Sequence, residues 1–216
     1  MMSLLTEGDA IGRFVAWALL LMSVSSWVLL IWKSWLLSVL GRDLPRSLAA
    51  FWQAPAMPQA VERLQALDRR GLLEPLMLAA LSQPPASTLA GAGQARARLT
   101  RVLRDGLQVA TERLQYGQVL LATVGSTAPF VGLLGTVWGI YHALTGMADS
   151  AQLTIDLVAG PVGEALIMTA AGLAVALPAV LAYNVLGRRI ARLEAELEGF
   201  AHDLLELLLA SPPDRP

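Results

Sequence analysis

Three long stretches of the chain are almost free of charged residues. They cover residues 14–36, 118–148 and 157–187, and polar segments separate and follow them. A helix needs about 20 mostly apolar residues to cross the hydrocarbon core of a bilayer, so each stretch is long enough. No segment shows the alternation of apolar and polar positions that predicts a β-strand. The pattern therefore predicts an all-α membrane protein with three transmembrane helices.

The polar segments also show helical spacing of their apolar residues. In residues 37–117, several prolines favour short helices with breaks between them, and apolar residues recur at helical intervals: Leu99, Leu103, Leu107 and Leu114. Residues 82–93 are rich in Pro, Gly, Ser and Ala and are predicted to form a loop. Residues 188–210 predict an amphipathic helix that continues the third transmembrane helix, and the proline-rich residues 211–216 end it.

The distribution of basic residues predicts the orientation in the membrane. Arginines and one lysine are concentrated between Lys33 and Arg113 and again after residue 187, whereas residues 149–156 contain none. Basic loops remain on the cytoplasmic side of a membrane. We therefore expect residues 1–13 and the turn 149–156 to be periplasmic. The loop 37–117 and the C-terminal segment 188–216 are expected to be cytoplasmic.

Composition excludes several classes of function. The net charge of −1 implies no strong electrostatic attraction to nucleic acid. The absence of cysteine excludes disulfides and zinc–thiolate sites, and the two histidines lie too far apart in sequence for metal-ligand spacing. No phosphate-binding glycine loop, nucleophile elbow or metalloprotease motif is present. We expect no metal, no cofactor and no enzymatic activity.

Glu164 is the only charged residue within the stretch 157–187. A carboxylate inside a transmembrane helix costs about 2.5–3.5 kcal/mol on insertion scales, so its default interpretation is functional. It is predicted to line a proton path or to contact a partner; the alternative is a satisfied hydrogen bond between helices. At about 1.5 Å per residue, Glu164 and Thr136 should both lie roughly 12–15 Å below the outer turn, with Thr169 about one and a half turns deeper. By themselves the two threonines would more simply bond to their own helices.

Two long motifs carry a family resemblance. Residues 126–140 (STAPFVGLLGTVWGI) and 163–184 (GEALIMTAAGLAVALPAVLAYN) resemble the paired signatures of the ExbB/TolQ proton-channel family, distant relatives of the flagellar stator protein MotA. Three transmembrane helices fit this family better than the four of MotA-type proteins. Within it, the ExbB branch is favoured over the TolQ branch. The family has Pro-Gly before its acidic motif, whereas this chain has Gly160-Pro161, which leaves the start of that helix open.

The resemblance implies a homopentamer in the bacterial inner membrane. Its lumen would hold the single transmembrane helices of two ExbD subunits, or TolR in the TolQ branch. Proton flow would move one part within the other and energise TonB, which opens outer-membrane receptors for iron-siderophores and cobalamin. By motif position, Thr136, Glu164 and Thr169 match the polar lumen residues.

Other roles in these motifs are simpler. The glycines and prolines are expected to serve helix packing: Pro129, Gly132, Gly135, Gly139, Gly172 and Pro178. The arginines of residues 96–104 predict a solvated face, with binding of anionic lipid as the minor alternative. A membrane scaffold whose acid only stabilises assembly, and a pore without motor function, remain alternatives to the motor subunit.

Overall fold

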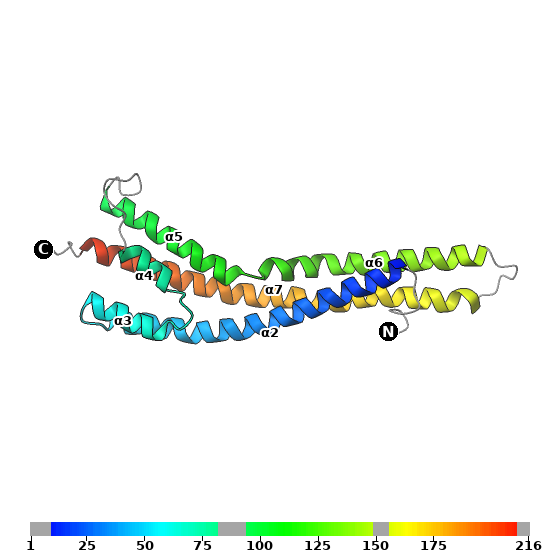
Figure 1. Cartoon of the computed structure of the whole chain (residues 1–216), viewed down its shortest axis with the longest axis horizontal. Coiled ribbons are helices and arrows are strands. Elements are labelled where there is room, and N and C mark those ends of the chain that lie inside the picture. The colour runs from blue at the N-terminus through cyan, green and yellow to red at the C-terminus, as the bar shows by residue number, and fades with distance from the viewer. Residues whose placement is uncertain (1–9, 82–93, 149–155, 211–216) are drawn as a thin grey trace. The chain divides into compact units, whose positions relative to one another are not determined.

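The computed structural model describes residues 10–81, 94–148 and 156–210. All regular secondary structure in these ranges is α-helical (Figure 1). The helices are α2 (Ala10–Trp52), α3 (Met57–Leu67), α4 (Glu74–Leu81), α5 (Ala95–Gln115), α6 (Gln118–Ala148) and α7 (Asp156–Ala210). Helices α2, α6 and α7 are long and apolar enough to cross a membrane. The predicted all-α class with three such helices is confirmed.

Four predicted segments lie wholly or mostly outside the described residues. These are the N-terminal segment 1–13, the loop 82–93, the turn 149–156 and the tail 211–216. The described chain divides into two compact units. We name the first the apolar unit; it contains α2 up to Lys33, α6, and α7 up to Leu186. The polar unit contains the rest of α2, helices α3 to α5, and α7 from Gly187 onward.

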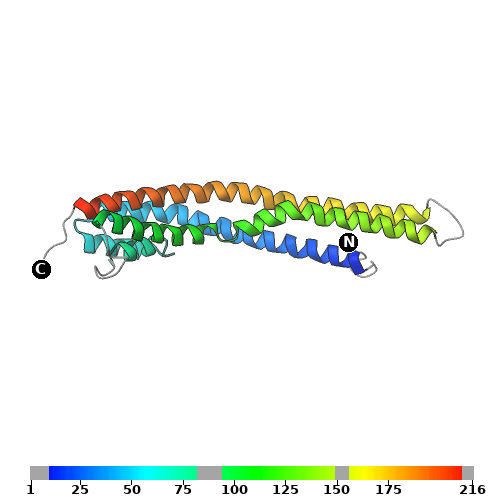
Figure 2. The same ribbon diagram turned by 90° about the horizontal axis from the view of Figure 1, so that it is seen from above.

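In the apolar unit, α6 and α7 lie side by side and antiparallel (Figures 1 and 2). Glycines set their closest approach. A Cβ atom added at Gly132 would lie 2.6 Å from the carbonyl oxygen of Met168, and one added at Gly172 would lie 2.6 Å from that of Ala128. Small residues allow such backbone contact in lipid, where dispersion and hydrogen bonding rather than the hydrophobic effect join helices.

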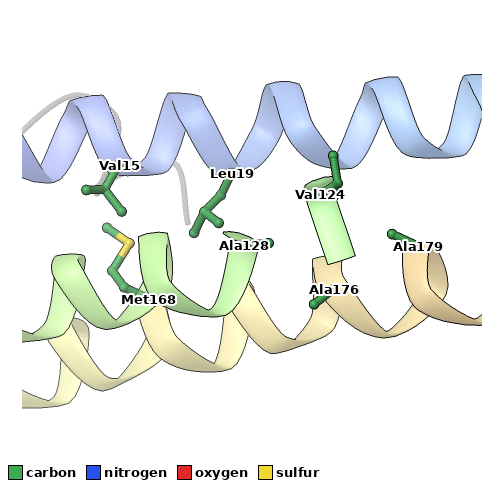
Figure 3. Close-up of a cluster of buried hydrophobic side chains, with 7 residues drawn as sticks. All are labelled: Val15, Leu19, Val124, Ala128, Met168, Ala176 and Ala179. Carbon is green, nitrogen blue, oxygen red and sulfur yellow. The ribbon is translucent and has the colours of Figure 1, made fainter. Parts of the chain in front are cut away.

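Helix α2 completes the apolar unit. Val15 and Leu19 of α2 pack with residues of α6 and α7 in one buried cluster (Figure 3). The other members are Val124, Ala128, Met168, Ala176 and Ala179. Many large apolar side chains on the opposite faces, such as Phe130 and Leu177, are exposed. Exposed apolar faces of this kind suit contact with lipid or with further transmembrane helices.

The polar unit has its own core. The predicted stripe on α5 is buried at Leu99, Leu103 and Leu114 and half-buried at Leu107. Gly106 allows α5 to approach α4, since a Cβ added there would lie 3.1 Å from the Cα of Leu76. Phe51 of α2 and Phe200 of α7 pack edge to face with ring centroids 5.2 Å apart. The predicted amphipathic segment after residue 187 is continuous with the rest of α7.

Pro45 and Pro161 both lie inside helices, although proline was expected to separate helices. Helix α2 continues through Pro45 to Trp52. Proline removes a backbone donor and normally kinks or ends a helix. Here the flanking Leu44 and Ser47 are buried, so tertiary packing holds the helix on both sides of the exposed proline. Helix α7 begins at Asp156 and includes Pro161, so the Gly160-Pro161 order is accommodated inside its first two turns.

Candidate functional site in the apolar unit

Glu164 lies near the beginning of α7, and its side chain is exposed in the single chain. Its neighbour Ala165 is buried against α6, where the Ala165 Cβ would lie 2.8 Å from a Cβ added at Gly139. Glu164 is therefore at the level of Gly139 on the antiparallel helix. Among the described residues, the side chain of Glu164 makes no ion pair or hydrogen bond.

Thr136 and Thr169 are in direct contact across the α6–α7 interface. The Thr169 hydroxyl donates a hydrogen bond to the Thr136 hydroxyl oxygen at 3.2 Å. Thr136 is 5% exposed, and its own hydroxyl donates to the carbonyl oxygen of Leu133 at 2.7 Å. Thr136 thus combines the simple bond to its own helix with a bond to its neighbour.

The observed register corrects the expected depths. Thr136 was expected at the level of Glu164, but it lies at the level of Thr169. Five residues separate Glu164 from Thr169, which is about 7.5 Å along the helix axis. The expected depths were obtained by counting residues inward from the turn between the two helices. That count was wrong because the close contact between Gly132 and Gly172 fixes the register.

Glu164 and the threonine pair lie at opposite margins of the buried face of α7. At 3.6 residues per turn, Glu164 and Thr169 point about 140° apart around the helix. The buried residues Ala165, Met168 and Gly172 occupy the arc between them. The structure therefore brings Thr136 and Thr169 together and keeps Glu164 separate from both.

The surroundings of Glu164 are open on the side away from α6. A Cβ added at Gly160 or at Gly163 would meet no atom within 4 Å. A second helix can therefore approach this part of α7 closely. A lone carboxylate facing lipid is costly, so in a membrane this face requires water or another protein helix. Such a carboxylate can bind and release a proton or pair with a cationic group.

The predicted packing residues occupy different positions. Gly132 and Gly172 form the backbone contact described above, and Gly135 lies against Met168 and Val15. Pro129 and Pro178 are interior residues of α6 and α7, and both are half-buried. In the described part of the chain, no group of three or more His, Asp or Glu side chains is placed to hold a metal ion.

Sequence reasoning treated Lys33 only as a basic residue at the end of a transmembrane helix. Its side chain is 1% exposed, and its ammonium nitrogen lies 6.0 Å from the centroid of the Trp32 ring. In the same unit, the amide group of Gln118 is buried and has no hydrogen-bond partner within the described residues. The only feature of the sequence that pointed to Lys33 or Gln118 was the position of each residue at one end of an apolar stretch.

Comparison with known proteins relates the chain to one protein family. Residues 68–199 match the family described as the MotA/TolQ/ExbB proton channel family. The chain is 40% identical to the biopolymer transport protein ExbB of Xanthomonas campestris pv. campestris, over 92% of this chain and 82% of that protein. It is 41% identical to ExbB of Neisseria meningitidis, over 92% of this chain and 91% of that protein.

The chain is also similar to proteins of the Tol-Pal system. It is 32% identical to TolQ of Pseudomonas aeruginosa, over 96% of this chain and 92% of that protein. Similarity to proteins with both names extends over nearly the whole chain and therefore includes both motifs.

Proposed function

The chain belongs to the MotA/TolQ/ExbB proton channel family, and we propose that it is the ExbB-type subunit of a proton-driven motor in the bacterial inner membrane. With an ExbD-like single-span protein, it would use the proton motive force to energise a TonB-like protein. The outcome would be uptake of iron-siderophores or cobalamin across the outer membrane. The chain is 40% and 41% identical to ExbB of Xanthomonas campestris and Neisseria meningitidis, against 32% to TolQ of Pseudomonas aeruginosa, and this difference supports the ExbB branch.

The observation that carries the proposal is the exposed carboxylate of Glu164 within an apolar helix. Residues 159–187 contain no other charged side chain. Acids inside transmembrane segments almost always face a bundle interior or a water-filled cavity and mark ion or proton pathways. The open face around Gly160 and Gly163 supports a helix from another chain beside this acid.

Thr136 and Thr169 have a different proposed role on the same route. Their hydrogen bond connects α6 to α7 one and a half turns deeper than Glu164. Thr169 is half-buried and lies at the margin of the buried face of α7. We assign Glu164 to proton transfer or partner contact, and the threonine pair to a polar position farther along the lumen.

The proposed assembly is a homopentamer that encloses two single-span partner helices. In this arrangement residues 14–36, 118–148 and 157–187 cross the membrane. Residues 1–13 and 149–156 would be periplasmic, and residues 37–117 and 188–216 cytoplasmic. The large number of exposed apolar side chains on α2, α6 and α7 supports burial against lipid and other helices.

Replacement of Glu164 by Gln tests the function. The change keeps the size of the side chain and removes its charge, so we expect normal assembly and loss of iron-siderophore uptake. Glu62→Gln, at an exposed position on α3, is the matched control and should retain uptake. Wild-type uptake by an assembled Glu164→Gln protein would contradict the proposal, whereas failure to assemble would favour the scaffold alternative.

Relatives named TolQ support a second candidate within the same class. A TolQ-type subunit would serve the Tol-Pal cell-envelope system with a TolR-like partner. The phenotype of a strain that lacks the gene for this chain separates the two candidates. An ExbB-type subunit predicts impaired growth under iron limitation, whereas a TolQ-type subunit predicts detergent sensitivity and cell-division defects. Mild-detergent purification with native mass spectrometry would identify the partner and count its copies. A homo-oligomer without a single-span partner would favour the alternative of a pore without motor function.

A further inference from the structure

Helix α2 has an exposed face in the polar unit where the first apolar stretch ends. Trp35, Ser38 and Arg42 are all exposed and lie three and four positions apart, so they share one side of the helix. Tryptophan is typical of the boundary between the hydrocarbon core of a membrane and water. This face therefore lies at the level of the lipid headgroups when residues 14–36 cross the membrane.

Arg70, in the loop between α3 and α4, lies over the ring of Trp35. The guanidinium carbon of Arg70 is 4.8 Å from the centroid of the ring, within the range of a cation–π contact. Trp35 is still 55% exposed, so the contact covers only part of the ring. The loop between α3 and α4 therefore brings a cation to the end of the first apolar stretch.

Hydrogen bonds fix the loop that carries Arg70. The carboxylate of Asp68 accepts hydrogen bonds from three backbone N–H groups, those of residues 72, 73 and 74. Arg113 donates to the carbonyl oxygen of Gly71 at 2.9 Å, and Gly71 has a φ of +60°, which favours glycine. Both carboxylate oxygens of Asp68 are thus occupied by backbone donors. A fixed loop loses little conformational freedom when a ligand binds to Arg70.

A second arginine reaches the same face from α7. Arg189 donates a hydrogen bond to the Ser38 hydroxyl oxygen at 3.4 Å, and that hydroxyl donates to the carbonyl oxygen of Ser34 at 2.7 Å. Trp35 and Ser38 are about 4.5 Å apart along the helix axis. Arg70 and Arg189 therefore come from distant parts of the sequence to the same turn of α2. We call the three arginines at this face the headgroup site: Arg42, Arg70 and Arg189.

The positive charge of the headgroup site is not neutralised by ion pairs. Acidic residues do lie nearby, since Asp43 follows Arg42 in α2 and Glu74 begins α4. Within the described residues, however, none of the three arginines of the site makes an ion pair. Three guanidinium groups beside an aromatic residue of the membrane boundary are suited to an anionic headgroup.

We propose that the headgroup site binds the phosphate of an anionic phospholipid in the cytoplasmic leaflet. Guanidinium groups bind phosphate through paired, charge-assisted hydrogen bonds, and arginine side chains extend along apolar surface to keep their charge at the headgroup level. The acyl chains of the lipid would lie along the apolar stretch that precedes Trp35, a contact that a soluble phosphate cannot make. The inference rests on the proposed placement of residues 14–36 in the membrane and adds a ligand to it.

Native mass spectrometry of the assembled full-length protein tests the site. The protein is purified in mild detergent and supplied with equal amounts of phosphatidylglycerol and phosphatidylethanolamine, and the wild type should retain phosphatidylglycerol preferentially. Arg70→Gln with Arg189→Gln should lower this retention about tenfold, because two guanidinium groups are lost. Arg63→Gln with Arg104→Gln is the matched control, since it removes the same charge at exposed positions outside the site and should leave retention unchanged. Equal losses in the two pairs, or no loss in either, would overturn the inference.

Arg42→Gln provides an independent measurement that does not disturb the fold. Within the described residues the side chain of Arg42 makes no hydrogen bond or ion pair, so its loss should lower lipid retention about threefold without unfolding the protein. Unchanged retention with Arg42→Gln would remove this residue from the site and contradict the proposal. Excess inorganic phosphate should not displace the lipid; displacement would identify a soluble anion as the ligand and overturn the inference. Glu164→Gln should leave lipid retention unchanged, so failure of the lipid site and failure of the proton-channel proposal are distinguishable.

Discussion

Thr169 donates a hydrogen bond to Thr136 across 3.2 Å, and Thr136 in turn donates to the carbonyl oxygen of Leu133. Both hydroxyl protons are therefore committed, one between the helices and one within α6. Transfer of a proton through either hydroxyl requires rotation of that group out of its present bond. The pair consequently contributes to helix association in this state, whatever part it takes in proton movement.

The Thr136–Thr169 bond should appear as a coupling between two substitutions. Valine keeps the shape of threonine and removes the hydroxyl, so Thr136→Val and Thr169→Val each abolish the same bond. Hydrogen bonds between transmembrane helices average about 0.6 kcal/mol in double-mutant cycles, and we expect a coupling of that size in the free energy of unfolding. Unfolding by SDS in a mild detergent measures it. Thr127→Val, which removes a bond within α6 alone, should show no coupling with Thr169→Val.

Gly172→Ala should destabilise the contact between α6 and α7. The added methyl group would lie 2.6 Å from the carbonyl oxygen of Ala128, a backbone atom that cannot turn aside as a side chain can. Overpacking of this kind typically costs about 1–3 kcal/mol. The free energy of unfolding in detergent should fall by that amount. Gly187→Ala, where an added Cβ meets nothing within 4 Å, should leave it unchanged or raise it; equal effects at the two positions would contradict the close approach.

The sequence was sufficient for the class of fold because hydrophobic patterning determines it locally. Each stretch of some 20 apolar residues predicts a transmembrane helix without reference to any other part of the chain. The stripe of Leu99, Leu103 and Leu114 likewise identified the buried face of α5. The position of Glu164 in an apolar helix was visible for the same reason.

Register between helices was not predictable in this way. It depends on which backbone atoms of α6 and α7 approach, and many glycines in both motifs are compatible with several registers. The observed choice pairs Gly132 with Gly172 and moves Thr136 away from the level of Glu164. Continuation of α2 through Pro45 has a similar origin, since it accompanies the burial of Leu44 and Ser47 beside the proline.

Asp68→Ala should destabilise the polar unit at the start of α4. The carboxylate of Asp68 accepts hydrogen bonds from the backbone N–H groups of Leu72, Leu73 and Glu74, at 3.0, 2.7 and 3.1 Å. Loss of a capping side chain usually costs about 0.5–2 kcal/mol. Asp68→Asn keeps acceptor capacity and should recover part of the loss in the free energy of unfolding. If alanine and asparagine were both neutral, these three bonds would not contribute to stability.

The orientation proposed for the membrane can be measured by single-cysteine labelling. The chain contains no cysteine, so Ser150→Cys in the predicted outer turn and Gln65→Cys at an exposed position on α3 each introduce one reactive thiol. A membrane-impermeant maleimide should label Ser150→Cys in cells whose outer membrane is opened, because the segment 149–156 lacks the basic residues that remain in the cytoplasm. Gln65→Cys should be labelled only after the inner membrane is opened as well, a treatment that also verifies that both thiols react. The reverse pattern would invert the topology and place the long basic segment between Lys33 and Arg113 in the periplasm, against the charge bias of the chain.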